Sequence, residues 1–355
     1  MLSCLRPDLP APTTFTVSEK PHRAKLDQNE SAIDLPESLK RELASALAAG
    51  AWNRYPQPKE YLEAKARFGA AVGVAPEQLA LTVGCDQVIQ AAFFLAGGPG
   101  RRARWFEPTY PQFALDSRVT GTLGEGIVLG EAVDALEPAQ VTAPPAPHLV
   151  CLVAPNNPTG GSFSREVLDA ALADPDRLVL VDEAYADFAG ESVLAEATTR
   201  PNLLVGRSLS KSLLAGVRLG WAVGHPEVIA ALERVYTAPY HLNALQLLVA
   251  SRYDEIKAHV GAAVAGVRAE RERVREALAR LPGVTVWPSR ANFLLFGVPD
   301  AGQLAADLAD RGVRVRDVSG LPGLASHLRV TIGARQENEL FLAALGELVT
   351  ASGAP

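Results

Sequence analysis

The sequence predicts an α/β fold, with a large domain over residues 35–250 and a smaller α+β domain over residues 251–355. Three observations lead to this prediction. Between residues 79 and 211, short runs that are apolar on both faces alternate with helical segments, which is typical of a buried and mostly parallel sheet. Residues 253–281 carry an apolar stripe at helical spacing. After Pro282 the pattern changes to short strands, as expected for a second sheet.

The elements of the large domain follow in a regular order. The first 25 residues are rich in Pro, Thr and charge, and we expect residues 1–34 to form an arm that packs with the small domain. Leucines at steps of four predict a helix over 35–50, and a second helix follows over 60–74. Strand-like runs then occupy residues 79–83, 103–108, 148–155, 177–185 and 202–211.

The small domain and two local segments complete the assignment. After the long helix we expect strands over 284–287, 291–298, 312–318 and 327–333, and a last helix over 338–351. The segment GTLGEG at 121–126 has the wrong glycine spacing for a nucleotide loop, and we expect a turn there. The basic run Arg101, Arg102 and Arg104 is interpreted as a solvated turn before a strand.

The composition excludes several classes of protein. The chain has 355 residues, of which 48% are hydrophobic, and a formal net charge of −6, which argues against a nucleic-acid-binding surface. Three widely spaced cysteines indicate no disulfide framework, and neither they nor the six histidines have the spacing of a metal site. The apolar runs are too short to span a membrane, and no signal peptide is evident. We therefore expect a cytoplasmic protein without a metal.

Polar residues gather where the predicted strands end. In an open α/β sheet, ligands bind outside the carboxyl ends of the strands. Each group alone has an ordinary explanation, because an aspartate after a strand is often a helix cap and NNPTG is a good turn. Their joint appearance predicts one site. The residues at these strand ends are Gly84, Cys85, Asp86, Asn157, Asp182, Tyr185, Ser208, Ser210 and Lys211.

The segments NNPTG, DEAY and SLSK…AGVRLG together resemble the fold-type I pyridoxal-phosphate (PLP) aminotransferases. The resemblance covers nearly the whole chain. Within that superfamily the chain is most similar to the histidinol-phosphate aminotransferases, which it also matches in LDQNES, NRYPQP, PYHLNALQ, SRANFLLF, GVRVRD and LRVTIGARQENELFLAAL. The resemblance implies a large domain with a seven-stranded, mostly parallel sheet, and PLP as the cofactor.

The resemblance also implies catalytic roles around that cofactor. Lys211 would form an imine with the cofactor aldehyde and then move the substrate proton. Asp182 would pair with the pyridine nitrogen and keep it protonated. Asn157 and Tyr185 would hydrogen-bond the phenolic oxygen of the ring. Tyr110 would lie over the ring face, although a core aromatic is the alternative.

The cofactor phosphate would have its own set of partners. Ser208 and Ser210 would donate hydroxyls, and Arg218 would add a charged hydrogen bond. The backbone N–H groups of Cys85 and Asp86, after Gly84, would hold the phosphate at a helix N-terminus. Tyr55, in NRYPQ, matches a residue that reaches the cofactor phosphate of a neighbouring subunit. The active unit is therefore expected to be a homodimer with shared sites.

Three residues match substrate-binding positions of the family. Arg329 corresponds to the arginine that binds the substrate α-carboxylate, and Arg316 to a position that meets the substrate phosphate. Surface strand charges are the alternative for both. Asn29 matches a segment at the entrance of the active site, with a turn-forming asparagine as an equal alternative. Asn157 would also face the substrate.

The chain departs from the family pattern at three places. Arg218 follows Lys211 by seven residues, where the family usually has eight. The turn usually written Gly-Ser/Ala-Asp-Glu is here Gly84-Cys85-Asp86-Gln87, which loses a serine hydroxyl. The arm lacks the Pro-Tyr pair that often helps to hold the substrate phosphate.

The resemblance implies amino transfer between histidinol phosphate and 2-oxoglutarate, in histidine biosynthesis. The cofactor-anchoring residues indicate which cofactor binds, but they do not indicate the second substrate. An aromatic or broad-range aminotransferase, or a threonine-phosphate decarboxylase, therefore stays open on the same scaffold. A cofactor-binding sensor without turnover is a further alternative, and we expect no partner among nucleic acids or membranes.

Overall fold

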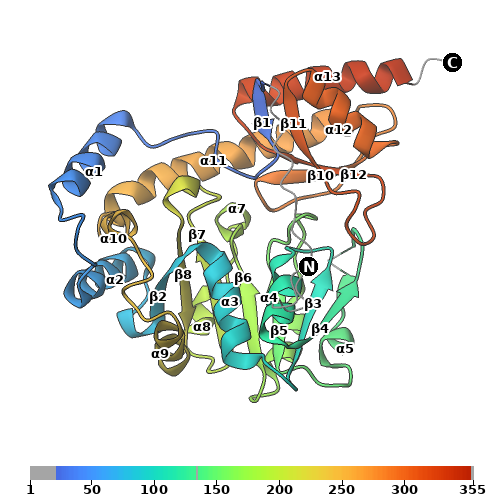
Figure 1. Cartoon of the computed structure of the whole chain (residues 1–355). Helices are drawn as coiled ribbons and strands as arrows, with labels where there is room; N and C mark the ends of the chain where they lie inside the picture. Colours follow the sequence, from blue (N-terminus) through green and yellow to red (C-terminus); the bar gives the residue numbers. More distant parts are fainter. Residues whose placement is uncertain (1–20, 133–134, 353–355) are drawn as a thin grey trace, which may run out of the picture.

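A computed structural model describes residues 21–132 and 135–352 and contains two sheets (Figure 1). The larger sheet has seven strands, in the order β2-β8-β7-β6-β5-β3-β4. Their bounds are β2 (Leu79–Val83), β3 (Arg102–Glu107), β4 (Leu123–Val128), β5 (Leu149–Val153), β6 (Leu178–Asp182), β7 (Leu203–Ser208) and β8 (Leu219–Gly224). Strands β7, β6, β5, β3 and β4 run parallel, and β8 is antiparallel to both of its neighbours. The predicted mostly parallel sheet is confirmed.

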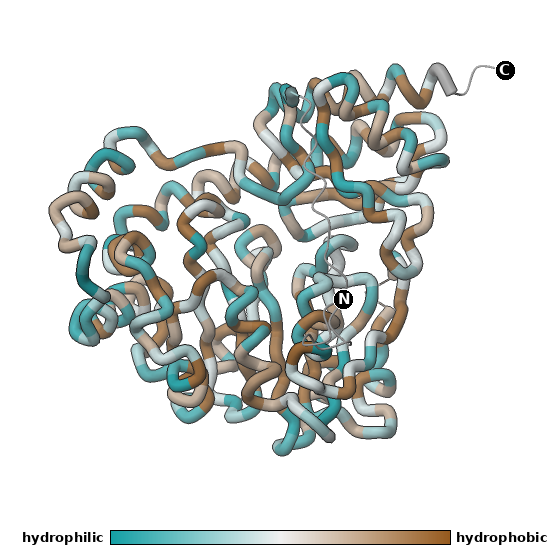
Figure 2. Tube along the Cα trace, in the orientation of Figure 1, coloured by the Kyte–Doolittle hydropathy of each residue, from teal (hydrophilic) through white to brown (hydrophobic). Residues whose placement is uncertain are grey.

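Helices cover both faces of this sheet. One face packs against α3 (Gly84–Ala96), α4 (Gln112–Thr120) and α9 (Pro226–Val235). The other packs against α1 (Glu37–Ala49), α2 (Pro58–Val72), α5 (Pro138–Thr142), α6 (Arg165–Leu172), α7 (Ala186–Ala189), α8 (Leu194–Ala197), α10 (Ala244–Ser251) and the first half of α11 (Tyr253–Leu278). Along β5, Cys151 faces the first core while Val150 and Leu152 face the second. Because both of its faces are buried, β5 is a continuous apolar run. Apolar segments run through the interior of this part of the chain (Figure 2).

The predicted turn at 121–126 is wrong, because most of this segment lies in the edge strand β4. Gly121 ends the preceding helix with φ of +73°, whereas Gly124 and Gly126 are required by packing rather than by a turn. A Cβ on Gly124 would lie 2.6 Å from the Trp105 ring, and one on Gly126 would lie 3.0 Å from Trp105 Nε1. Three glycines in six residues look like a turn, but Gly124 and Gly126 give the indole of Trp105, on the neighbouring strand, room to lie across β4.

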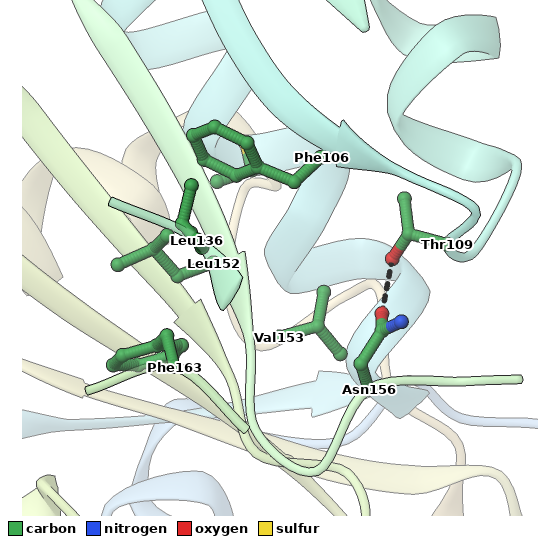
Figure 3. A pocket seen from close by; sticks show the side chains of 8 residues that line it. Phe106, Thr109, Leu136, Leu152, Val153, Asn156 and Phe163 are labelled. Atoms are coloured by element: carbon green, nitrogen blue, oxygen red, sulfur yellow. Dashed lines mark hydrogen bonds between the residues drawn. The ribbon is translucent and has the colours of Figure 1, made fainter. Parts of the chain in front are cut away.

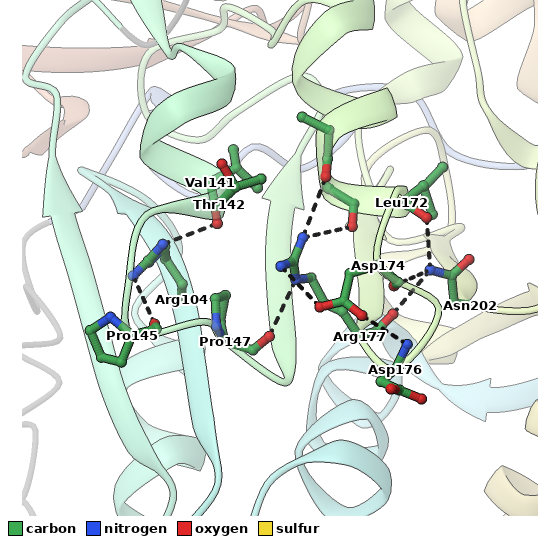
Figure 4. A network of polar contacts seen from close by, with 12 residues as sticks. Arg104, Val141, Thr142, Pro145, Pro147, Leu172, Asp174, Asp176, Arg177 and Asn202 are labelled. Atoms are coloured by element: carbon green, nitrogen blue, oxygen red, sulfur yellow. Dashed lines mark hydrogen bonds and ion pairs between the residues drawn. The ribbon is translucent and has the colours of Figure 1, made fainter.

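The interpretation of the arginine run as solvated is wrong for Arg104, which is 1% exposed within β3. Its Nη1 donates to the carbonyl oxygens of Gln140, Val141 and Ala143, each at 3.0 Å. Its Nη2 donates to Glu125 Oε2 at 2.7 Å. Arg104 therefore ties the edge of the sheet to the segment that follows α5 (Figure 4).

A second polar network joins the N-terminal ends of the central strands β5, β6 and β7. Arg177 donates to the carbonyl oxygens of Pro147 and Ala171, at 3.2 and 3.0 Å. Asn202 Nδ2 donates to the carbonyl oxygens of Leu172, Asp174 and Arg177, at 3.0 to 3.2 Å (Figure 4). These contacts satisfy loop carbonyls that would otherwise be buried without a partner.

The smaller sheet has five strands, in the order β1-β11-β12-β10-β9. Their bounds are β1 (Ala24–Leu26), β9 (Thr285–Val286), β10 (Phe293–Gly297), β11 (Val313–Asp317) and β12 (His327–Thr331), and α12 (Ala301–Asp310) and α13 (Arg335–Ser352) cover the sheet. Strand β1 pairs with β11 in parallel, so the start of the described chain belongs to this sheet. Residues 1–20 of the predicted arm lie outside the described residues, and the domain boundaries stay a prediction.

Helix α11 connects the two cores. Ile256 and Val260, in its first half, pack in the core of the large sheet. Val274 and Leu278, near its end, pack in the core of the small sheet. Within residues 21–132 and 135–352, no helix is long and apolar enough to cross a membrane, and no cluster of metal-ligating side chains is present.

Replacing Arg104 by methionine keeps most of the buried stem but removes the guanidinium from three backbone carbonyls, in α5 and just after it. We expect Arg104→Met to lower the free energy of unfolding by about 3 kcal/mol. The matched control is Arg102→Met, which changes an exposed side chain on the same strand and should cost less than about 0.5 kcal/mol. Urea unfolding of both variants measures the difference, and equal costs would contradict a structural role for the buried guanidinium.

Candidate active site

Asp182 ends β6 and is 4% exposed. Its Oδ1 accepts two hydrogen bonds, from the backbone N–H of Ala184 at 2.9 Å and from Cys85 Sγ at 3.2 Å. Burial raises the pKa of Asp182 to about 6, although both hydrogen bonds favour the charged form. A buried carboxyl with a raised pKa at a strand end is a typical functional group.

Lys211 follows β7 and lies beside Tyr185, which follows β6. The Lys211 Nζ atom is 6.0 Å from the centroid of the Tyr185 ring and donates to the carbonyl oxygen of Gln28 at 3.4 Å. The Tyr185 ring is buried and packs edge-on against Phe293, with 5.2 Å between centroids. The parallel strands thus bring an amine and a phenol together at one edge of the sheet.

Asn29 is buried and has a left-handed backbone, with φ of 55°. Its Nδ2 donates to the Tyr185 hydroxyl at 3.0 Å, and its Oδ1 accepts from Thr331 Oγ1 at 3.0 Å. Its backbone N–H donates to the same threonine oxygen at 2.9 Å. Asn29 therefore adopts a turn-like conformation and also fixes the phenol of Tyr185.

Two serines and an arginine lie at the other end of the site. Ser208 donates to Ser210 Oγ at 3.0 Å, and Arg218 Nη1 donates to that same oxygen at 3.0 Å. Gly84 has φ of +72°, and a Cβ there would lie 3.1 Å from Arg218 Nη2. The seven-residue spacing therefore still brings Arg218 against the serines and the start of α3.

Asp86 and Tyr110 complete this end. Asp86 Oδ2 accepts from Arg218 Nη2 at 3.2 Å, and its Oδ1 accepts from the Tyr110 hydroxyl at 3.0 Å. Burial, and then the charge of Asp86, raise the pKa of Tyr110. Tyr110 is half-buried against the core under α3, and its position over a cofactor ring stays a prediction.

Asn156 was not singled out by the sequence analysis, yet it joins two segments of the site. Its Oδ1 accepts from Thr109 Oγ1 at 2.7 Å, and its Nδ2 donates to the carbonyl oxygen of Pro108 at 2.9 Å. It thereby links the segment that carries Tyr110 to the turn that carries Asn157. A small pocket lies beside this contact, with apolar side chains on its other walls (Figure 3). In the sequence, its place as the first residue of the NNPTG motif could have indicated that Asn156 belongs to the site.

Arg329, on β12, reaches Asn157 across the site. Its Nη1 donates to Asn157 Oδ1 at 2.5 Å, and its Nη2 donates to the carbonyl oxygen of Asp27 at 2.7 Å. The side chain is 7% exposed, and its Nε has no hydrogen-bond partner within the described residues. Burial lowers the pKa of Arg329 to about 10. A buried guanidinium with an unused N–H is suited to a planar anion.

Arg316 and Tyr55 lie further out. Arg316 is opposite Arg329 in the pairing of β11 with β12, and its side chain is exposed. Tyr55 is 75% exposed and packs edge-on against Tyr240, with 5.7 Å between centroids. In the described part of the chain, Tyr55 makes no hydrogen bond or ring contact with another predicted site residue. Its expected role requires a second subunit.

The donor set fits the cofactor that the sequence predicts. Hydroxyls, a guanidinium and a helix N-terminus without a side-chain cap could hold a phosphate at one end. The buried carboxyl of Asp182 could pair with a ring nitrogen, and Lys211 is the amine beside it.

Replacing Asp182 by asparagine removes a charge that burial disfavours. In the ligand-free protein, the carboxyl has a folded-state pKa of about 6 against 3.8 for an exposed aspartate, so it stabilises the fold at low pH and loses this contribution as the pH rises through 6. We therefore expect Asp182→Asn to gain stability relative to the original protein by about 1 kcal/mol between pH 5 and pH 8. Urea unfolding at both pH values tests this, and a difference that does not change with pH would contradict it.

Comparison with known proteins identifies the family. The family described as aminotransferase class I and II matches residues 21–345. A histidinol-phosphate aminotransferase 2 from Cupriavidus pinatubonensis is 38% identical over 96% of this chain and 95% of its own. A histidinol-phosphate aminotransferase from Sinorhizobium meliloti, solved with pyridoxal-5'-phosphate, has a TM-score of 0.79 at 22% identity and covers 94% of this chain and 92% of its own. An L-threonine-O-3-phosphate decarboxylase from Porphyromonas gingivalis also has a TM-score of 0.79 at 22% identity, and covers 92% of this chain and 99% of its own. The chain belongs to the PLP-dependent class I and II aminotransferase family.

Proposed function

We propose that the protein transfers an amino group between histidinol phosphate and 2-oxoglutarate. The family acts on amino acids and 2-oxo acids, and relatives such as the one from Cupriavidus pinatubonensis are named for histidinol phosphate. The observation that supports this choice is the pair Arg329 and Arg316, opposite each other on β12 and β11. Two guanidinium groups on neighbouring strands suit substrates that carry a carboxylate in one half-reaction and a phosphate in the other.

In this proposal each residue has a defined task. The cofactor, when bound, supplies an aldehyde and an electron-withdrawing ring. Lys211 Nζ would hold that aldehyde and would move the proton of the substrate carbon. Asp182 keeps the proton on the ring nitrogen, because a buried carboxylate is stabilised by a cation beside it. Arg329 orients the substrate carboxylate.

Tyr185 and Asn157 hold the phenolic oxygen of the ring in its charged form. Tyr185 is already fixed by Asn29, and Asn157 by Arg329. Arg329 donates to Asn157, which in this proposal hydrogen-bonds the cofactor ring. A substrate carboxylate bound at Arg329 would therefore also affect the position of Asn157. Gly84, Cys85 and Asp86 at the start of α3, with Ser208, Ser210 and Arg218, hold the cofactor phosphate.

A homodimer is part of the same proposal. Four large apolar side chains that are exposed in the described chain lie in segments next to α1, α2 and α10, and two of them, Tyr55 and Tyr240, are in ring contact. Their exposed fractions are 54% for Ile33, 76% for Trp52, 75% for Tyr55 and 53% for Tyr240. We propose that a second copy covers them and that Tyr55 thereby contacts the cofactor phosphate of that copy.

Threonine-phosphate decarboxylation is the second candidate. Arg329 and Arg316 would also suit one substrate that carries a carboxylate and a phosphate together, and a decarboxylase of this kind has the same TM-score as the aminotransferase from Sinorhizobium meliloti.

A single-turnover absorbance assay distinguishes these functions. The cofactor-loaded protein is mixed separately with histidinol phosphate, glutamate, phenylalanine and threonine phosphate, and conversion of the bound cofactor to its amine form is followed. We expect fast conversion by histidinol phosphate and glutamate, slow conversion by phenylalanine, and no release of carbon dioxide from threonine phosphate. Fast conversion by phenylalanine with none by histidinol phosphate would replace the substrate. Lys211→Ala is the control and should convert nothing.

Mixing two inactive variants tests the shared site. If Tyr55 serves the partner's site, a dimer of one Lys211→Ala subunit and one Tyr55→Ala subunit contains one site with both residues intact and one with neither. We expect each variant alone to be impaired, Lys211→Ala completely, and the refolded mixture to recover activity toward about a quarter of the original level when subunits pair at random. No recovery, in a mixture shown by sedimentation to be dimeric, would contradict a Tyr55 that crosses the interface.

A further inference from the structure

We propose that Cys85 is a positioning residue for Asp182. Its thiol donates to one oxygen of the carboxyl, so that the other oxygen meets the ring nitrogen of the cofactor and the carboxyl stays ionised. This inference rests on the role of Asp182 in the proposed function, and it adds a task for the side chain of Cys85, which acts only through that aspartate.

The contact is short and buried on both sides. Cys85, the second residue of α3, is 7% exposed, and its Sγ lies 3.2 Å from Asp182 Oδ1. The backbone N–H of Ala184 donates to the same oxygen at 2.9 Å. In the described part of the chain, no donor contacts Oδ2. Both protein donors thus hold one oxygen and leave the second for a ligand.

The neighbouring backbone fixes the sulfur in place. Gly206, on β7, is paired with Asp182 across the two strands. A Cβ on Gly206 would lie 2.8 Å from Cys85 Sγ and 3.2 Å from Val88 Cγ1. The sulfur therefore fills the space above the glycine, where an ordinary residue would displace it. Sheet and helix together hold the thiol against the carboxyl.

The thiol is a donor and not a nucleophile at this position. Burial, followed by the charge of Asp182, raises the pKa of Cys85 well above its usual range, so the sulfur keeps its proton. A donor to Oδ1 favours the carboxylate over the carboxylic acid, which opposes the effect of burial. Without that donor, the proton shared between Asp182 and the ring nitrogen would move toward the aspartate.

The ¹⁵N chemical shift of the ring nitrogen measures this proton directly in enzyme loaded with labelled cofactor. We expect Cys85→Ala to move the signal toward that of neutral pyridine and to weaken cofactor binding about three- to tenfold. Cys85→Ser supplies a hydroxyl donor and should restore both values. Cys151→Ala is the matched control, because this cysteine is buried in the same core without a bond to Asp182, and it should leave the signal unchanged.

Two outcomes separate this inference from the proposed function. If Asp182→Ala leaves the ¹⁵N signal unchanged, the proposed role of Asp182 fails. If Asp182→Ala moves the signal while Cys85→Ala matches the original protein, only the role of Cys85 is overturned.

A measurement on the original protein covers the case in which Cys85→Ala does not fold. The infrared S–H stretching band that disappears in Cys85→Ser should lie at lower frequency than the band that disappears in Cys151→Ala, because a hydrogen bond weakens the S–H bond. Equal frequencies would overturn the inference.

Discussion

The burial of one carboxyl group, that of Asp182, is the constraint on which the site depends. Taking a carboxylate out of water costs free energy unless a cation or several donors face it. The described residues supply two donors, both on Oδ1, and burial still raises the pKa of Asp182 to about 6. The carboxyl is therefore unfavourable for folding in the ligand-free chain, and in the proposed function a protonated ring beside it would offset that cost.

The parallel sheet places the other site residues at the same edge as that carboxyl. The ends of β5, β6 and β7 bring Asn157, Asp182 and Lys211 to one edge. The small sheet adds Arg329 from β12, and the segment after β1 adds Asn29. The site is thus built from both sheets, and the hydrogen bonds of Asn29 and Arg329 join them through side chains rather than through backbone pairing.

The sequence analysis predicted the sheet, the helices and the family correctly, because apolar periodicity and local motifs carry that information. It was wrong about Arg104 and about residues 121–126, since a buried arginine and a glycine-containing strand are explained only by partners distant in sequence, such as Ala143 and Trp105. The contact between Cys85 and Asp182 was beyond it for the same reason, because 97 residues separate them. The roles of the site residues, the domain boundaries and the homodimer stay predictions, and Tyr55 shows why, because a single chain gives its side chain no partner in the site.

Helix α11 makes the two halves of the chain interdependent. The boundary predicted at 250/251 falls just before a helix whose first half belongs to the core of the large sheet and whose end belongs to the core of the small one. A fragment that starts there would carry Ile256 and Val260 into water, and the remaining fragment would lose the side chains that close its own core. The protein is therefore a poor candidate for division into separately expressed halves, because each half depends on side chains of the same helix.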